Sequence, residues 1–87
     1  MDAIYVPRDL HEYKQHLKPN DVFIYSFILS AAELEYNSPA LMHRAEFSKW
    51  LKISPSAFYN SVQRLINTGL ITKIAPNIYT AKDYKEV

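Results

Sequence analysis

The stretch 54–71 carries uncharged hydrogen-bonding side chains at helical spacing. Ser56, Asn60 and Gln63 follow each other at steps of four and three residues, and Tyr59 adjoins them, so a helix would present all four together. The amide groups of Asn60 and Gln63 can each form two hydrogen bonds with the edge of adenine. The same face also carries Asn67 and one cation, Arg64, and no carboxylate lies in this stretch. The pattern predicts a helical face suited to the edge of a base pair and the phosphates beside it.

Positive charge is concentrated in the part of the chain that holds this stretch. Residues 43–85 contain seven Lys or Arg and two Asp or Glu, a net charge of +5, whereas residues 1–42 have a net charge of −3. The whole chain has a net charge of only +1. This asymmetry favours a polyanionic partner for the second half.

The helix that would position these groups has both of its ends specified locally. Ser54 can cap its first amides, and Pro55 follows at the first helical position, where a missing N–H costs nothing. An apolar stripe runs along the opposite face, made of Phe58, Val62, Leu65 and Ile66. Gly69, the chain's one glycine, lies where a helix commonly ends on a residue with positive φ.

Two further helices are expected to support this one. Asn20 or Asp21 can cap a long core helix whose apolar face contains Phe23, Ile24, Phe27, Ile28, Ala31 and Leu34, with Tyr25 and Leu29 at its margins. A short helix over 44–52 would direct Phe47 and Leu51 to the core, with Trp50 covering the edge of that cluster. The segment 40–43 between them is interpreted as a partly buried linker.

The remaining segments predict short β-structure around the helices. Two β-prone runs over 72–80 flank Pro76 and Asn77, residues that suit a tight turn, so a β-hairpin is expected there. Residues 4–6 could form an N-terminal edge strand before Pro7. A helical turn is expected within 8–17, and the polar segment 81–87 is expected to fray.

Length and composition favour one folded domain without catalytic chemistry. The chain has 87 residues and is 48% hydrophobic, which predicts a single domain over 1–87, with its core at roughly 20–80 and an N-terminal arm at 1–19. It has no cysteine, and its three histidines are scattered, so neither thiol chemistry nor a metal site is expected. With one glycine it cannot form a glycine-rich phosphate loop, and no serine has the surroundings of a nucleophile. We expect no enzyme activity, no cofactor and no small-molecule ligand.

The sequence shows neither the long apolar run of a membrane span nor the pattern of a signal peptide. The expected location is therefore the cytoplasm.

The segment 47–71 resembles the winged helix-turn-helix family. Its apolar anchors match Phe47, Leu51, Ile53, Phe58, Val62 and Leu65, and the ending Asn67-Thr68-Gly69-Leu70-Ile71 is similar to the family's helix end before the first wing strand. The resemblance implies an α+β, mostly α fold, with a three-helix core and a C-terminal β-hairpin wing. Two features depart from the family's pattern. Lys52 stands where glycine is frequent, which implies an unfavourable backbone or a different turn, and the expected wing has Lys73 as its one cation.

A second resemblance concerns the beginning of the chain. The residues Ala3-Ile4-Tyr5-Val6-Pro7-Arg8-Asp9-Leu10, Leu17-Lys18-Pro19-Asn20-Asp21 and Tyr25 are similar to the N-terminal winged-helix domains of plasmid and phage replication initiators. Together the resemblances imply sequence-specific binding of double-stranded DNA. The family's mode of docking implies contacts to base edges from Ser56, Tyr59, Asn60 and Gln63. It also implies contacts to phosphates from Lys49, Lys52, Ser54, Arg64 and Lys73. The role would be regulation of transcription or initiation of replication, for a plasmid, phage or other mobile element. A homodimer or a larger parent protein is expected. The alternative is a protein–protein interaction module of the same fold that does not bind DNA.

Overall fold

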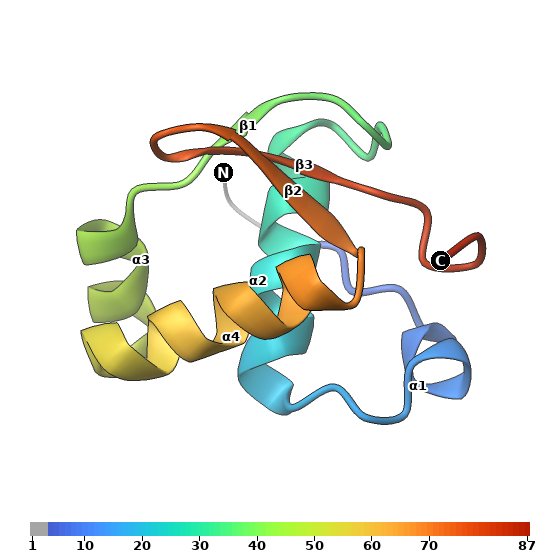
Figure 1. Cartoon of the computed structure of the whole chain (residues 1–87), viewed down its shortest axis with the longest axis horizontal. Coiled ribbons are helices and arrows are strands. Elements are labelled where there is room, and N and C mark those ends of the chain that lie inside the picture. The colour runs from blue at the N-terminus through green and yellow to red at the C-terminus, as the bar shows by residue number, and fades with distance from the viewer. Residues whose placement is uncertain (1–3) are drawn as a thin grey trace.

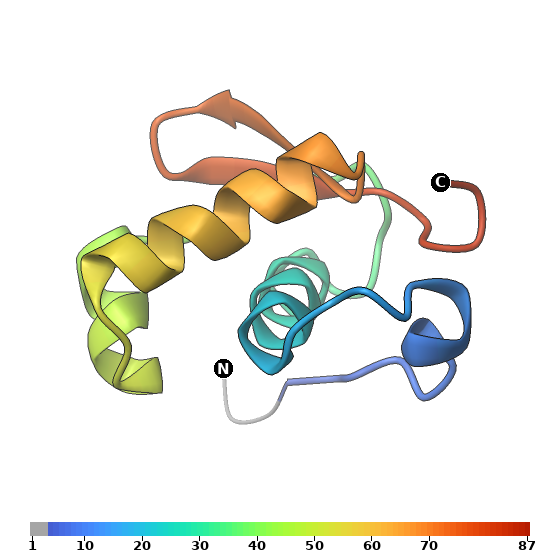
Figure 2. The ribbon, with the colours of Figure 1, turned by 60° about the horizontal axis from the view of Figure 1, so that its bottom comes forward.

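Residues 4–87, which the computed structural model describes, form a small α+β domain with four helices and one three-stranded antiparallel sheet (Figure 1). In chain order the elements are α1 (Leu10–Tyr13), α2 (Pro19–Ala31), β1 (Ala40–Leu41), α3 (Arg44–Leu51), α4 (Pro55–Asn67), β2 (Ile71–Ala75) and β3 (Ile78–Ala81). Helix α4 and the hairpin of β2 and β3 lie on the same side of α2, above it in the view of Figure 2. The predicted α+β, mostly α class is confirmed.

The central helix α2 is buried on more sides than its periodicity predicts. Ile24, Tyr25, Ile28 and Leu29 are each at most 2% exposed, although the sequence pattern puts Tyr25 and Leu29 at the margins of the apolar face. Helix α4 and strands β1 and β3 all pack against α2, and the ring of Tyr84 lies 6.3 Å from that of Tyr25. Because several elements surround α2, side chains on most of its circumference are buried.

The first turn of α2 differs from the predicted one. The helix begins at Pro19, so Asn20 and Asp21 lie inside it and neither is its cap. Asp21 is in the third helical position, where its Oδ2 accepts a hydrogen bond from the backbone N–H of Lys18 at 3.1 Å. A carboxylate in this position satisfies an amide that precedes the helix and also favours the positive end of the helix dipole.

The last turn of α2 ends before the predicted core residue Leu34. Glu33 and Leu34 both have positive φ, 57° and 64°, and the N–H of Leu34 donates to the carbonyl of Leu29 at 2.8 Å. This reversal leaves Leu34 50% exposed, and Phe23 near the other end of the helix is 41% exposed. The prediction that Phe23 and Leu34 belong to the core is therefore wrong.

Helix α3 lies within the predicted range 44–52. Phe47 is 4% exposed, and its ring centroid is 4.6 Å from that of Phe27 and 5.7 Å from that of Trp50. Trp50 itself is 59% exposed, so it covers one edge of the aromatic cluster and leaves most of its own surface free.

A tight turn connects α3 to α4. Lys52 adopts the left-handed conformation, with φ 58° and ψ 42°, and the N–H of Ile53 donates to the carbonyl of Ser48 at 3.0 Å. This is the unfavourable backbone that a lysine in place of glycine implies. The predicted cap is confirmed, because Ser54 Oγ accepts a hydrogen bond from the N–H of Ala57 at 3.0 Å.

Helix α4 ends as its sequence predicts. Gly69 has a φ of +83°, its N–H donates to the carbonyl of Ile66, and the N–H of Leu70 donates to the carbonyl of Leu65, each at 3.0 Å. These two bonds define a Schellman motif, in which a left-handed residue closes the helix. Three of the predicted stripe residues, Phe58, Val62 and Leu65, are buried, and Ile66 packs against them while partly exposed.

The sheet has the strand order β1-β3-β2, with β3 in the centre. The predicted hairpin is confirmed: β2 and β3 are antiparallel, and Pro76 and Asn77 form the turn, where Asn77 has a φ of 65°. The predicted linker 40–43 contains strand β1, whose Ala40 pairs with Tyr79 of β3. Thus the third strand comes from the segment between α2 and α3.

No strand forms over residues 4–6, so the predicted N-terminal edge strand is wrong for the part of the chain that the structure describes. The N–H of Tyr5 donates instead to the hydroxyl of Ser30 on α2, at 2.9 Å. Residues 1–3, including Ala3 of the N-terminal resemblance, lie outside the described residues. The predicted helical turn within 8–17 corresponds to α1.

The C-terminal segment 82–87 packs beside α1, as both ribbon views show (Figures 1 and 2). Tyr84 is 5% exposed, its ring lies 5.6 Å from that of Tyr13, and its hydroxyl donates to the carboxylate of Asp9. The hydroxyl of Tyr25 donates to the carbonyl of Lys82 at 2.6 Å. The expectation that this segment frays is therefore wrong, because it supplies a buried aromatic ring.

Candidate nucleic-acid interface

The outward face of α4 carries the four residues predicted to contact bases. Ser56, Tyr59 and Asn60 are exposed and Gln63 is half-buried, while Phe58 on the opposite face is 2% exposed. Tyr59 leaves 56% of its surface free. The structure thus brings the four residues together on one uncharged, accessible surface.

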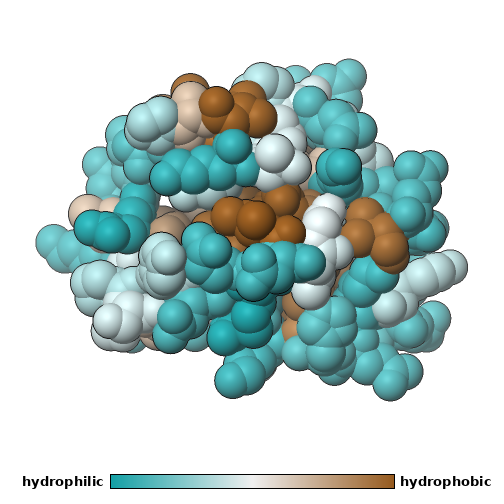
Figure 3. Space-filling model, in the orientation of Figure 1, coloured by the Kyte–Doolittle hydropathy of each residue, from teal (hydrophilic) through white to brown (hydrophobic). Residues whose placement is uncertain are grey.

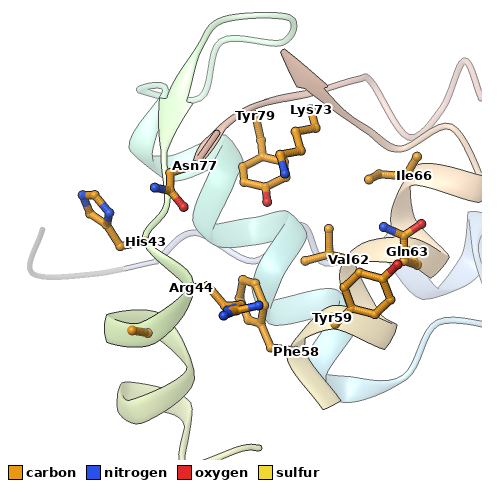
Figure 4. Close-up of a pocket in the computed structure, with 11 residues that line it drawn as sticks. His43, Arg44, Phe58, Tyr59, Val62, Gln63, Ile66, Lys73, Asn77 and Tyr79 are labelled. Carbon is orange, nitrogen blue, oxygen red and sulfur yellow. The ribbon is translucent and has the colours of Figure 1, made fainter. Parts of the chain in front are cut away.

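A groove of about 440 Å³ lies between this helix and the hairpin (Figure 4). Its apolar lining comes from Ala45, Phe58, Val62, Ile66 and Tyr79, and its polar lining from His43, Arg44, Tyr59, Gln63, Lys73 and Asn77. Figure 3 shows apolar side chains in the middle of this face of the molecule, bordered above and below by hydrophilic ones. Two of the predicted base-contacting residues and one predicted phosphate-contacting residue therefore border the same groove.

The charges around the groove are positive. Arg44 comes from the start of α3 and Lys73 from β2, and both are exposed. The two ion pairs found within residues 4–87 involve neither of them, and no carboxylate lines the groove. Burial raises the pKa of Tyr79, and the nearby charge of Arg44 acts in the opposite direction, so the phenol stays neutral at physiological pH. A groove with these charges favours an anionic chain.

Three other predicted phosphate-contacting residues lie at the junction of α3 and α4. Lys49 in the last turn of α3 and Lys52 in the turn are both exposed, and Ser54 is exposed at the start of α4. The hydroxyl oxygen of Ser54 already accepts the N–H of Ala57, which leaves its O–H as the group available to a phosphate. These residues lie next to the N-terminus of α4, where the helix dipole also favours an anion.

The structure gives Arg64 a different place from the predicted one. Its Nε and Nη2 donate to Oδ2 and Oδ1 of Asp21 on α2, both at 2.9 Å, and Nη2 also donates to Ser61 Oγ at 3.1 Å. Asp21 is fully buried, whereas 35% of the Arg64 side chain is exposed. Arg64 therefore joins α4 to α2, and we remove it from the candidate phosphate contacts.

Sequence reasoning missed Arg44, His43, Asn77 and Tyr79 as residues of the groove. In the sequence, Arg44 stands at the start of an expected helix and Asn77 in an expected turn. No local pattern links the start of α3 with the hairpin, because it is the pairing of β1 with β3 that brings these segments together. Tyr79 lies opposite Lys73 only because the register of the hairpin shifts between Lys73 and Ala75, so the sequence held no signal for this pairing.

Metal-ligand groups and membrane-spanning helices are two further features to consider in the described residues. Within 4–87, no group of three or more His, Asp or Glu side chains lies together as metal ligands would. In the same part of the chain, no helix is long and apolar enough to span a membrane.

No known family model, no curated protein and no solved structure matches this chain. Its function is therefore inferred from the residues and geometry described above.

Proposed function

We propose that this domain is a winged helix-turn-helix that binds double-stranded DNA in a sequence-specific manner. Helices α3 and α4 would form the helix-turn-helix, and the hairpin of β2 and β3 would form the wing. The observation that carries the proposal is the exposed face of α4, which bears amides and hydroxyls but no carboxylate and lies beside a groove bordered by Arg44 and Lys73. Uncharged hydrogen-bonding groups between cations suit bases between phosphates.

In this proposal α4 enters the major groove of the DNA. Asn60 and Gln63 bond to adenine edges, and Ser56 and Tyr59 contact neighbouring bases. Phosphates are held on one flank by Lys49, Lys52 and the O–H of Ser54, and on the other by Lys73 and Arg44. The contact by Arg44 is added because it borders the groove opposite the hairpin.

The protein would act by occupying its site rather than by catalysing a reaction. Its role would be to regulate transcription or to initiate replication, in the cytoplasm, for a plasmid, phage or other mobile element. A single module of this kind buries roughly 600–1,000 Å² of its own surface on DNA, so we propose that it works as a homodimer or within a larger protein.

A salt titration of binding to a mixed-sequence duplex tests the proposal. The logarithm of the association constant should fall linearly with the logarithm of the salt concentration, because each protein–phosphate contact releases counterions. An absence of binding even at low salt would reject DNA binding and favour the interaction module instead. Selection from a random duplex pool would then identify the preferred site, and a palindromic site would indicate a dimer.

A further inference from the structure

The ion pair between Asp21 and Arg64 is held by several hydrogen bonds within the protein. Both carboxylate oxygens of Asp21 accept from Arg64, and Oδ2 also accepts the N–H of Lys18. Arg64 has a second internal partner in the hydroxyl of Ser61. Burial disfavours the charged form of Asp21, but the hydrogen bonds from Arg64, Ser61 and Lys18 outweigh it and lower the pKa of the carboxyl group. The pair is therefore ionised at neutral pH.

This pair neutralises the one cation of α4. Arg64 is the only Lys or Arg between Pro55 and Asn67, and 35% of its side chain is exposed. It lies four residues after Asn60 on the same helix, so an unpaired guanidinium would lie beside the base-contacting face. With Asp21 as its counterion, Arg64 brings no net charge to that face.

We propose that Asp21 determines the specificity of the DNA interface by holding Arg64 away from the phosphate backbone. This inference depends on the proposed DNA binding. Lys and Arg contacts to phosphates strengthen binding to every sequence alike, whereas base contacts distinguish sequences. By neutralising Arg64, Asp21 keeps the affinity for random DNA low and leaves discrimination to the amides and hydroxyls of α4.

The test compares the salt dependence of duplex binding in the wild-type protein with that in three variants. The quantity compared is the slope of the logarithm of the association constant against the logarithm of the salt concentration. Asp21→Asn frees Arg64, so this slope should be steeper in the variant by roughly 0.9, the value of one added phosphate contact. The double variant Asp21→Asn/Arg64→Gln should return to the wild-type slope. Lys73→Gln, the matched control, should be shallower by roughly 0.9. The affinity ratio between the selected and a random duplex should fall several-fold in Asp21→Asn alone.

Two results would overturn the inference while leaving DNA binding intact. One is a wild-type slope in a folded Asp21→Asn variant. The other is a double variant whose slope is shallower than the wild-type slope, as for Lys73→Gln, because Arg64 would then already contact a phosphate. If Asp21→Asn does not fold by circular dichroism, the double variant decides, since it replaces both charges by amides. A wild-type protein that binds no duplex would reject the proposed function itself.

Discussion

Helices α2 and α4 each contain 13 residues, but they are buried in different ways. Helix α2 has seven buried residues around most of its circumference, including the fully buried Asp21 and Ser26. Helix α4 has four, Phe58, Ser61, Val62 and Leu65, all along one stripe. In so small a domain, α2 is enclosed by its neighbours, whereas α4 keeps a whole face free. The uncovered face of α4 is where side chains are available to a partner rather than to packing.

The largest expected effect is on the free energy of unfolding, and it differs between substitutions in α2 and in α4. Ile28→Ala in α2 should lower the free energy of unfolding by about 2–5 kcal/mol, because it removes a fully buried side chain and leaves a cavity. Asn60→Ala on the exposed face of α4 should change it by less than about 0.5 kcal/mol. Urea unfolding measures both. Similar losses in the two variants would show that the face of α4 is not free.

Acid should weaken the ion pair between Asp21 of α2 and Arg64 of α4. The pKa of Asp21 in the folded protein is lowered below the ordinary value of about 3.9. The unfolded chain therefore binds the proton first, and the stability that the pair contributes is present above about pH 4 and lost as the pH falls through the folded-state pKa. Because Arg64 is a third exposed, water screens part of the attraction, and we expect this loss to be smaller than the effect of Ile28→Ala.

Unfolding in urea at neutral and acid pH measures this loss, and Asp21→Asn should lack it. Asp9 is the control: its pKa is also lowered, chiefly by the hydroxyl of Tyr84, and it lies outside the contact between α2 and α4. Asp9→Asn should therefore retain the acid loss due to Asp21. An equal acid loss in wild type and Asp21→Asn would contradict the assignment.

The free face of α4 should affect sequence preference rather than overall affinity. Asn60→Ala should reduce discrimination at one base pair by about 1–3 kcal/mol, the usual value of a bidentate contact. Lys73→Ala should weaken binding to all sequences about equally. Selection from a random pool, followed by affinity measurements on single-base variants of the site, distinguishes the two. An unchanged preference in Asn60→Ala would remove that residue from the base contacts.

The start of α4 should depend on its own cap. Ser54→Ala should cost about 1 kcal/mol of unfolding free energy, because the N–H of Ala57 loses its partner. Ser56→Ala, two residues further on the exposed face, is the matched control and should cost less than about 0.5 kcal/mol. A larger loss for Ser56 than for Ser54 would mean that Ser56 has a structural partner in solution.

The smallest effects are expected at two left-handed residues, one after α2 and one before α4. Glu33 and Lys52 have φ of 57° and 58°, a conformation that costs a side-chain-bearing residue energy and glycine almost none. Glu33→Gly and Lys52→Gly should each raise the melting temperature slightly, corresponding to about 0.5 kcal/mol after the entropy of the unfolded glycine is subtracted. Lys49→Gly inside α3 should instead lower it.

Helix α4 and the hairpin were predictable from the sequence because their signals are local. A serine cap, a proline in the first turn, an apolar stripe and a terminal glycine act within a few residues of the structure they specify. The same holds for the turn at Pro76 and Asn77. The polar face of α4, which has no carboxylate, followed directly from this helix, since its residues share one side at helical spacing.

The tertiary structure alone decided which of these surfaces are covered and which charges are neutralised. Arg64 finds Asp21 across 43 residues, and Tyr84 finds Asp9 across 75. Strand β1 has only two residues and exists because β3 pairs with it. Tyr25 and Leu29 are buried because other elements surround α2. Each of these outcomes depends on a partner distant in the chain, which is why residue spacing alone could not predict them.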